Sequence, residues 1–472
     1  MSELLVQAAP AALFVARGLE ALVVLAGVTQ SVSYVWQLLL AAFVIARRPP
    51  VTETAILRRR YAAAAPRISI LVPAHNEAAT IITSVRSLLA LDYPDFEVLV
   101  VDDGSTDATL GCLVEAFGLR ERRGRTACGA RRFGARAEGR LRVLSKLNGG
   151  KGDALNAGLA EADGELVCVI DADCVLEPDA LLRAAQPFID HPDEVVAVGA
   201  TIRPVNGCRV TPEGRVEVDT PRNPLALLQT VEYLRAFMSA RLAWSQLGAL
   251  TLISGAFGLF RRDVLVEIGG YSTTTLGEDL ELVVRLRRHL QDGHRQGRVV
   301  FIPEPLCWTE APEDLAVLRR QRVRWQRGAL ETFAAHWPML FHRRYGRIGL
   351  LGLGRILLVD VMGPILELAG WSLLLLFWAL GALSTDHALA YLALAISFGV
   401  AISLFTLSLE EAELRRFPRT RSLVALAAAA VLENFGYRQL NTLWRIEGTL
   451  RHFTTPPSWG TMTRKGFAPA AA

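Results

Sequence analysis

The chain is poor in lysine and has no cysteine spacing typical of a metal or disulfide site. Of its 51 basic residues, only Lys146, Lys151 and Lys465 are lysines, so arginine carries almost all the positive charge. The six cysteines show no paired CxxC spacing with histidines, which argues against zinc binding and against a disulfide framework. We expect reduced thiols in a cytosolic domain, with a hidden disulfide as the less favoured alternative.

Other absences exclude whole classes of protein. The net charge of +4 is small and by itself does not indicate nucleic-acid binding. The Walker pattern is missing, which argues against a P-loop ATPase. The composition does not fit a disordered, collagen-like or coiled-coil chain.

Hydrophobic residues are abundant. They make up 51% of the 472 residues, and the mean hydropathy is +0.29. Water-soluble chains are rarely so apolar, so part of this chain is expected in lipid. Charged residues still reach 21%, which predicts a sizeable water-facing domain as well.

The first membrane span is predicted over residues 21–46, which carry no charge. This run exceeds the roughly 20 residues that a helix needs to cross the hydrocarbon core, and it is too long for a signal peptide. Arg47, Arg48 and the basic run 58–60 follow it. The positive-inside rule then places the following domain in the cytoplasm and the N-terminus outside.

A second membrane region is predicted after Arg347. Residues 356–383 are apolar except for two acidic residues, and Pro364 should kink this helix. The run 388–409 is uncharged, and arginines follow it at 415, 416, 419 and 421. Residues 422–443 are ambiguous: they form either a fourth span or a helix that enters the bilayer only in part.

Between these regions, short apolar runs alternate with helical patterns from Ile68 to about Phe301. Buried strands are predicted over 68–72, 98–101, 141–144, 166–170 and 195–198, and helices over 78–90, 107–117, 152–162 and 179–189. This alternation predicts a mostly parallel α/β sheet with helices on both faces. In such sheets, ligands bind beyond the carboxyl ends of the strands.

Polar clusters follow three of these strands, at residues 73–77, 102–107 and 171–173. Asp171 and Asp173 are two residues apart in an extended segment, so their carboxylates share one side. This pair suits Mg²⁺ or Mn²⁺, which prefer oxygen ligands and often keep substrate phosphates in their shell. The alternative is a solvated turn or helix start.

The other two regions favour a nucleotide. Either Thr106 or Asp107 is expected to cap the next helix, which leaves Asp102 and Asp103 free to accept hydrogen bonds from a nucleobase or ribose. Lys151 opens a later helix after two glycines, where a cation and backbone amides suit phosphate. The alternative for this segment is a glycine-rich surface turn.

Two more motifs stand farther along the chain. Glu278 and Asp279 precede a helical pattern, where they either cap the helix or supply a general base. Gln321, Arg324 and Trp325 share one face of a helix that begins near Glu313. Five arginines crowd that helix, and we expect some to face lipid headgroups while one face is turned to an anionic substrate.

Taken together, these motifs resemble membrane-embedded family 2 glycosyltransferases such as the cellulose, chitin, hyaluronan and poly-N-acetylglucosamine synthases. The resemblance covers Ile68 to about Gly328, together with the flanking spans. The ordered set is VPAHNE at 72–77, VDDGSTD at 101–107, KGDALN at 151–156, DAD at 171–173, GED at 277–279 and QRVRW at 321–325.

The resemblance implies a GT-A domain that uses a UDP-sugar and inverts the anomeric centre. Its donor nucleotide would lie at Pro73, His75, Glu77, Asp102, Asp103, Lys151 and Asp171. The implied metal, Mg²⁺ or Mn²⁺, would lie at Asp171 and Asp173. Asp279, beside Glu278, would be the base, Gln321 and Arg324 would bind diphosphate, and Trp325 would form the floor of the acceptor site.

Three functions remain open at this point. The leading interpretation is a processive polysaccharide synthase in the bacterial inner membrane, multi-pass, with a cytoplasmic catalytic domain and with partner subunits or a homo-oligomer allowed. The second is a single transfer to a lipid acceptor, as in glucosylceramide synthases. The third is an inactive α/β membrane scaffold or transporter. No nucleic-acid partner is expected.

The predicted division of the chain is an N-terminal helix and linker over 1–65, a cytosolic domain over 66–312, interface helices over 313–348, C-terminal membrane helices over 349–455 and a tail over 456–472. Two segments have no assigned role. Residues 119–142 contain nine arginines and are expected to form a mobile loop that could touch lipid. Residues 207–222 are expected to be an irregular insertion.

Overall fold

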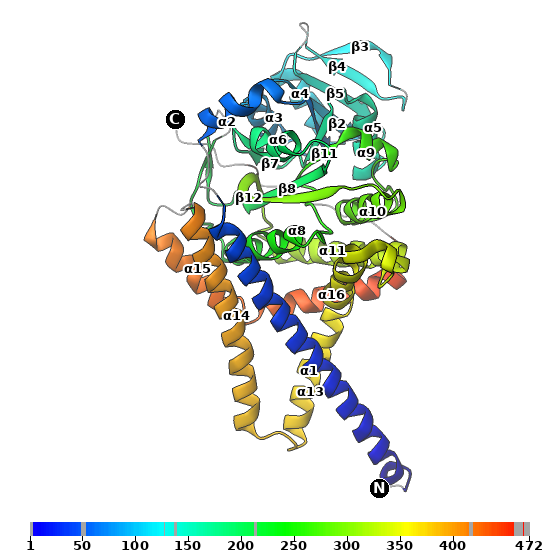
Figure 1. The fold of residues 1–472 in the computed structure, drawn as a ribbon, viewed down its shortest axis with the longest axis vertical. Coiled ribbons are helices and arrows are strands. Elements are labelled where there is room, and N and C mark those ends of the chain that lie inside the picture. The colour runs from blue at the N-terminus through cyan, green and yellow to red at the C-terminus, as the bar shows by residue number, and fades with distance from the viewer. Residues whose placement is uncertain are drawn as a thin grey trace.

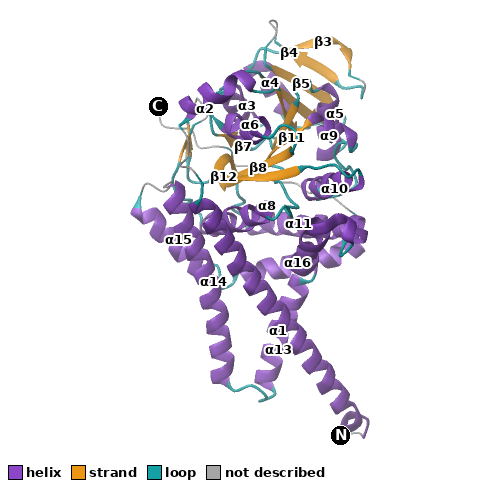
Figure 2. Ribbon diagram, viewed as in Figure 1, coloured by secondary structure: helices purple, strands orange, loops and turns teal. Residues whose placement is uncertain are grey.

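The computed structural model describes residues 3–48, 53–126, 128–135, 139–211, 215–414, 419–456 and 466. Most of the predicted tail therefore lies outside the described residues. In Figure 1, an α/β domain forms one end of the molecule and long helices extend from the other end. Several helices form a layer between these two parts (Figure 2).

A ten-stranded mixed sheet forms the centre of the α/β domain, in the order β3-β4-β5-β2-β1-β6-β11-β8-β12-β7. The strands are β1 Ile68–Ala74, β2 Phe96–Asp103, β3 Arg120–Arg125, β4 Arg131–Gly134, β5 Leu141–Lys146, β6 Leu166–Ile170, β7 Cys174–Leu176, β8 Val195–Pro204, β11 Phe257–Arg261 and β12 Arg298–Thr309. All five predicted strands are present, as β1, β2, β5, β6 and β8.

The central strands are parallel where the sequence predicts parallel pairing. β1 pairs in parallel with both β2 and β6, and β2 pairs in parallel with β5. Every residue of β2, β6 and β8 is buried, which explains their near-continuous apolar sequence. Because β1, β2 and β6 are parallel neighbours, their carboxyl ends meet at one edge of the sheet. β11 runs antiparallel between β6 and β8.

The four predicted helices are also confirmed. They are α3 Ile81–Leu89, α4 Thr109–Ala116, α5 Lys151–Glu161 and α6 Ala180–Asp190. The other helices of this domain are α2 Thr54–Tyr61, α9 Arg262–Glu267 and α10 Glu278–Asp292. Gly158 of α5 lies against the side chains of Leu71 and Val101, so the helix packs directly on the sheet.

The composition of the arginine-rich segment predicted a loop, but most of its described residues are in strands. Its described residues form the β3–β4 hairpin at the edge of the sheet, at the end of the molecule opposite the long apolar helices (Figure 1). β4 pairs with β5 and buries Phe133, which holds the hairpin on the sheet. Exposed arginines on an edge strand oppose pairing with another sheet.

The second unassigned segment is mostly irregular, as predicted, and contains one short hairpin. Its strands are β9 Arg209–Val210 and β10 Val216–Glu217, which form a separate two-stranded sheet. Cys208 and Val210 are buried there against Trp308 and Val175.

The layer beneath the sheet consists of helices with irregular turns. It contains α7 Pro224–Leu234, the π-helical turn Arg235–Arg241, α8 Leu242–Gln246, α11 Leu315–His336 and α16 Tyr437–Thr454. α11 begins where predicted, because the side chain of Asp314 accepts hydrogen bonds from the N–H groups of Ala316 and Val317. α11 and α16 pack along one another, burying Val323 and Trp444.

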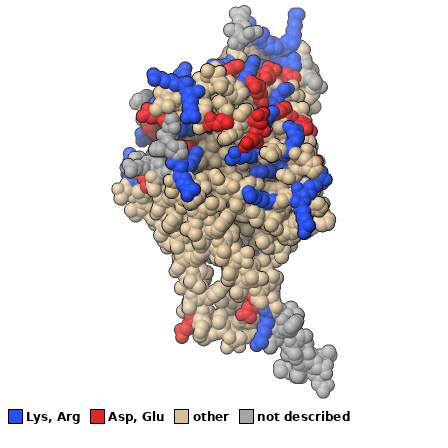
Figure 3. Space-filling view, viewed as in Figure 1, with Lys and Arg blue, Asp and Glu red and all other residues tan. Residues whose placement is uncertain are grey.

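Two described helices are long and apolar enough to cross a membrane, over Glu20–Ala46 of α1 (Glu3–Ala46) and Thr385–Ala412 of α14 (Thr385–Leu414). A third candidate is a bent pair, Ile348–Val361 followed by α13 (Gly363–Ala379). The bend of 43° lies directly before Pro364, as predicted. Figure 3 shows charged side chains gathered on the α/β domain, whereas the surface of the long helices is almost uncharged except near its tip.

The ambiguous segment 422–443 does not form one span. α15 (Thr420–Leu432) ends before Glu433, and α16 begins at Tyr437 after a turn at Gly436 with φ of +97°. The buried Glu433 carboxylate pairs there with Arg235 and Arg438, so this turn is tied to the helix layer. α15 is too short to cross the hydrocarbon core.

Candidate active site

A cavity of about 760 Å³ lies between the carboxyl edge of the sheet and the helix layer, a volume typical of ligand sites. We call its sheet side, made by the residues that follow β1, β2, β5 and β6, the strand rim. We call the side made by α7, α8, α11 and the turns near them the helix wall. The predicted site residues that line this cavity are Pro73, His75, Glu77, Asp103, Lys151, Asp171, Asp173, Glu278, Asp279, Gln321, Arg324 and Trp325.

Asp102 is the predicted site residue that does not line the cavity. Its carboxylate is buried and accepts a hydrogen bond from the N–H of Ser105 at 3.2 Å, so it holds the turn after β2. Asp103 lines the cavity but is not free either. It accepts from Lys146 Nζ at 2.6 Å and from the N–H groups of Gly149 and Gly150 at 3.0 and 2.8 Å.

The loops after β1 and β2 are joined to each other. Asn76 has a left-handed backbone with φ of +58°, and its side-chain oxygen accepts hydrogen bonds from the N–H groups of Thr106 and Asp107. Gly104 has φ of +66°, and a Cβ there would lie 2.6 Å from the backbone nitrogen of Asn148. Asp107 caps α4, as predicted, by accepting from the N–H of Thr109 at 2.9 Å.

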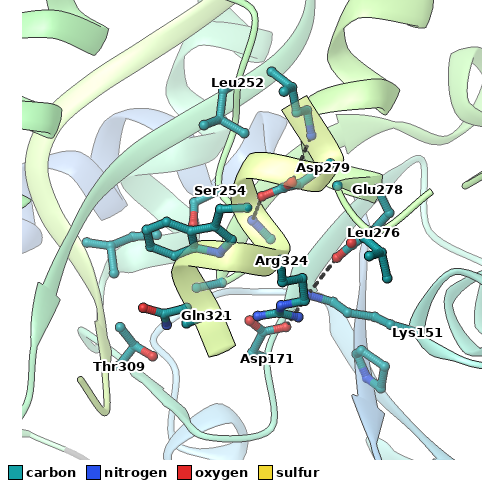
Figure 4. Close-up of a pocket in the computed structure, with 18 of the residues that line it drawn as sticks. Lys151, Asp171, Leu252, Ser254, Leu276, Glu278, Asp279, Thr309, Gln321 and Arg324 are labelled. Carbon is teal, nitrogen blue, oxygen red and sulfur yellow. Dashed lines mark hydrogen bonds and ion pairs between the residues drawn. The ribbon is translucent and has the colours of Figure 1, made fainter. Parts of the chain in front are cut away.

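Lys151 stands at the start of α5 and lies between two carboxylates. Its Nζ is 2.6 Å from Asp171 Oδ1 and 3.1 Å from Glu278 Oε1, and Figure 4 shows these ion pairs beside Arg324. Burial lowers the pKa of Lys151, but the two carboxylates outweigh burial and raise it overall. Burial also raises the pKa of Glu278, against the opposing effect of Lys151.

Asp279 lies near the start of a helix and faces the cavity. It lies in the first turn of α10, where Oδ1 accepts from the N–H of Leu280 at 2.8 Å. Oδ2 accepts from the N–H of Gly255 at 3.0 Å, from the loop before β11. The N-cap position of α10 is Gly277, without a side-chain capping bond, and the Asp279 carboxylate lies at the cavity surface (Figure 4).

α11 brings its polar face to Asp279 through a contact between two glycines. A Cβ on Gly328 would lie 2.6 Å from the Cα of Gly277, so the two backbones touch. Gly277 precedes α10, and Gly328 lies one turn after Arg324 and Trp325. As predicted, Gln321, Arg324 and Trp325 share a face, and that face lines the cavity.

The donor set at the end of β6 fits a hard divalent cation. Asp171 and Asp173 lie on either side of Ala172 and both line the cavity. Within the described part of the chain, no three His, Cys, Asp or Glu side chains form a metal-ligand cluster. Two protein carboxylates leave coordination positions for the phosphate oxygens of a substrate, as Mg²⁺ commonly requires.

Sequence motifs did not indicate several further polar or charged residues that line the cavity. On the helix wall they include Glu232, Arg241, Trp244, Arg355 and Asp360. They lie in apolar helices and π-helical turns where no known motif marks them. For Arg241, the sequence offered one signal of a buried polar site: an arginine that lies between apolar residues of a helical pattern.

Comparisons with known proteins agree with this geometry. The model of the "Glycosyltransferase like family 2" family matches residues 66–328. A poly-beta-1,6-N-acetyl-D-glucosamine synthase of Staphylococcus epidermidis is 29% identical over 274 residues, which cover 58% of this chain and 57% of the relative. The corresponding Staphylococcus aureus synthase is 28% identical over 265 residues, covering 56% and 55%.

The chain thus spans about half the length of the curated relatives it matches. Among solved structures, a mannosyltransferase from Pyrobaculum calidifontis in complex with GDP-Man and Mn²⁺ superposes with a TM-score of 0.55. Its sequence is 21% identical, and the match covers 90% of this chain and 98% of that one. This likeness shows the fold, which is of the GT-A type predicted from the sequence.

The candidate spans and these relatives identify a membrane protein. The family model covers more than half of the chain, and its range ends at Gly328, where α11 meets the turn before α10. The chain belongs to glycosyltransferase family 2.

Proposed function

We propose that this protein transfers a sugar from a UDP-sugar to the end of a growing polysaccharide, with inversion at the anomeric carbon. The observation that carries the proposal is that Asp279 shares one cavity with Asp171 and Asp173 and with Arg324 and Trp325. The proposed base, the proposed diphosphate site and the proposed aromatic surface would thus act in one place. The similarity to polysaccharide synthases supports a polymeric product.

The strand rim would hold the donor. Pro73, His75, Glu77 and Asp103 would surround the nucleoside, and Asp103 would act by ordering the loop from Lys146 to Gly150. Asp171 and Asp173 would hold Mg²⁺ or Mn²⁺, which when bound neutralises charge on the diphosphate. Arg324 of α11 supplies positive charge beside Asp171 and Lys151 (Figure 4).

Inversion in one displacement requires one base and no enzymic nucleophile. Asp279 would take the proton of the acceptor hydroxyl. The hydroxyl oxygen attacks the anomeric carbon as the bond between that carbon and the diphosphate breaks. The leaving diphosphate gains negative charge, which Arg324 and Gln321 are placed to stabilise. Trp325, with 43% of its surface exposed, would support the apolar face of the acceptor sugar.

We further propose that the α/β domain faces the cytoplasm, because basic residues 47, 48 and 58–60 follow the first candidate span. A nucleotide-sugar donor would then reach the cavity from the same compartment. Partner subunits and self-association both remain compatible with this arrangement.

The test uses the purified full chain in detergent or lipid nanodiscs. UDP-N-acetylglucosamine, UDP-glucose and GDP-mannose are supplied with Mg²⁺, with Mn²⁺ or with chelator, and nucleoside diphosphate release and product size are measured. We expect metal-dependent UDP release and long glycan chains. A single discrete glycolipid would instead support transfer to a lipid acceptor, and no turnover with any donor would refute the proposal.

A further inference from the structure

The helix wall contains buried polar atoms that have no partner in the described structure. They are Nη1 of Arg241, Nε1 of Trp244 and Oε1 of Gln321, and the three side chains line the same cavity. Buried polar groups in proteins are almost always hydrogen-bonded, so three such atoms around one cavity require an explanation. A ligand that supplies the missing partners is the simplest one.

Arg241 and Trp244 come from one irregular helical segment. Arg241 ends the π-helical turn that begins at Arg235, and Trp244 lies three residues later in α8. The guanidinium carbon of Arg241 lies 3.8 Å from the ring centroid of Phe237, so one face of the guanidinium is covered. π-helical turns are frequent at functional sites.

The chemistry of these atoms limits the ligand. Arginine and the indole N–H only donate hydrogen bonds, so the ligand must present oxygen acceptors to them. Gln321 Oε1 only accepts, so the ligand must also present a hydroxyl or amide N–H. Tyr233, Phe237 and Trp244 add aromatic surface to the same wall.

The charge of the cavity favours a neutral ligand here. Among the described lining residues, nine carboxylates share the cavity with four lysine or arginine side chains, and three of the carboxylates also pair with Lys146, Arg322 or Arg445 behind them, which leaves a small negative excess. The electrostatic effect of Asp279 reaches Arg241, although burial dominates and lowers the pKa of Arg241 to about 10. Arg241 is therefore charged at neutral pH, in a cavity whose excess negative charge disfavours an acidic glycan.

We propose that Arg241 and Trp244 form an acceptor subsite that binds hydroxyl or amide carbonyl oxygens of a neutral glycan and so places its terminal hydroxyl at Asp279. The inference rests on the proposed function and deepens it. Neither Arg241 nor Trp244 belongs to the proposed donor-binding set, so we expect the subsite to affect the acceptor and to leave the donor unaffected.

The experiment compares Arg241→Met, Arg241→Lys and Trp244→Phe with wild type. Transfer from UDP-N-acetylglucosamine to a short β-1,6-linked N-acetylglucosamine oligomer is measured over a range of oligomer concentrations. We expect the acceptor KM to rise about tenfold to a hundredfold in Arg241→Met and about three- to tenfold in Trp244→Phe. Arg241→Lys should recover part of the loss, and the donor KM should stay within about twofold of wild type.

Two matched controls separate this role from stability. Arg287 of α10 is also buried with unpartnered nitrogens but does not line the cavity, so Arg287→Met should leave the acceptor KM unchanged. Trp378 donates its indole N–H to Thr385 at the far end of α13, so Trp378→Phe should also be neutral. Thermal unfolding of each variant shows whether a loss reflects misfolding.

Four outcomes would overturn the subsite. The first is an unchanged acceptor KM in both Arg241→Met and Trp244→Phe while wild type is active, which leaves the proposed function intact. The second is a shift in the acid limb of the pH–rate profile of Arg241→Met with no change in its acceptor KM. That result would make Arg241 a charge partner of Asp279. The third is a loss seen only with a glucuronate-containing oligomer. The fourth is a wild-type enzyme that releases no UDP, which refutes the proposed function and this inference together.

Discussion

The two sides of the cavity differ in how their polar groups are satisfied. On the strand rim, Asp103, Asn76 and Lys151 are each held by several partners. On the helix wall, Arg241 and Trp244 leave buried nitrogen atoms that have no partner among the described residues. The rim is thus ordered before any ligand arrives, whereas the wall is complete only when something fills it.

The unsatisfied polar groups of the helix wall lower the stability of the folded protein. An unsatisfied buried donor or acceptor costs about 1–3 kcal/mol, which a folded protein tolerates best where a ligand restores the lost hydrogen bonds. A preorganised rim suits a donor nucleotide of constant structure. A less satisfied wall suits an acceptor that binds, reacts and then must move.

The largest expected effect on the transfer rate comes from Asp279, which lies between the strand rim and the helix wall. Asp279→Asn removes the proposed base and should lower the transfer rate by about 10²- to 10⁴-fold. Donor binding should remain near wild type, because Asp279 contacts Gly255 and Leu280 rather than the residues of the rim. UDP release reports the rate, and calorimetry with UDP reports binding.

Asparagine is the appropriate replacement because its amide oxygen can still accept the hydrogen bond from the N–H of Leu280. A melting temperature close to wild type would show that the fold is kept. Near-normal turnover by Asp279→Asn would make the assignment of the base untenable.

A second prediction concerns the donor side alone. Asp173→Ala should weaken UDP binding in the presence of Mn²⁺ by at least about tenfold and leave metal-free binding unchanged, because only the metal-dependent part of donor binding is lost. Calorimetric titrations of UDP with Mn²⁺ and with chelator measure both quantities. Equal affinities for wild type and variant in Mn²⁺ would remove Asp173 from the metal site.

The third prediction tests whether the helix wall must touch the turn before α10. Gly328→Ala places a Cβ 2.6 Å from the Cα of Gly277 and should force α11 away. Such overpacking costs about 1–3 kcal/mol, and the displaced Arg324 and Trp325 should lower turnover by about tenfold to a hundredfold. Turnover and melting temperature are measured together.

Gly111→Ala is the matched control for that substitution. Gly111 is also helical, in α4, and a Cβ there meets nothing within 4 Å. Alanine should be neutral or slightly stabilising at this position. If both variants behave alike, the contact between α11 and the turn is not important for activity.

The smallest effect is a pH dependence that arises far from the cavity. Burial raises the pKa of Glu97, but hydrogen bonds from Ser69, the N–H of Asp163 and Arg142 outweigh burial and lower it overall. The stability that Glu97 contributes is therefore present above its unfolded pKa of about 4.3 and is lost as pH falls through the lower folded value.

Melting temperatures between about pH 6 and pH 3 test this. The Glu97→Gln variant should be less stable than wild type near the upper end of this pH range. It should lose less stability than wild type when the pH is lowered. Parallel curves for the two proteins would show that Glu97 makes no net contribution.

Local patterns predicted the strand rim well. The apolar runs that became β1, β2 and β6 were visible in the sequence, and the polar residues after them meet because parallel strands end at one edge. The arginine-rich segment was misread because β4 is four residues long, too short for its alternation to be recognised. Its pairing with β5 is a tertiary contact.

The helix wall was predicted only in part. The face of α11 followed from helical spacing, since residues three and four apart are neighbours on a helix. The contact of Gly328 with Gly277 joins residues far apart in the chain, and no periodicity reveals it. Arg241 and Trp244 sit in and beside a π-helical turn, which changes the register of the helix face.

By itself, the sequence determined the class of this protein: an α/β domain with acidic residues at its strand ends, apolar helices on either side and the ordered motifs of one family. These features are local, because they depend on hydrophobic periodicity and on spacing along the chain. The tertiary structure alone decided which carboxylates are already occupied, how close α11 lies to Asp279 and which buried donors lack partners. Those properties depend on contacts between distant segments, where small differences in packing decide whether a polar group is satisfied.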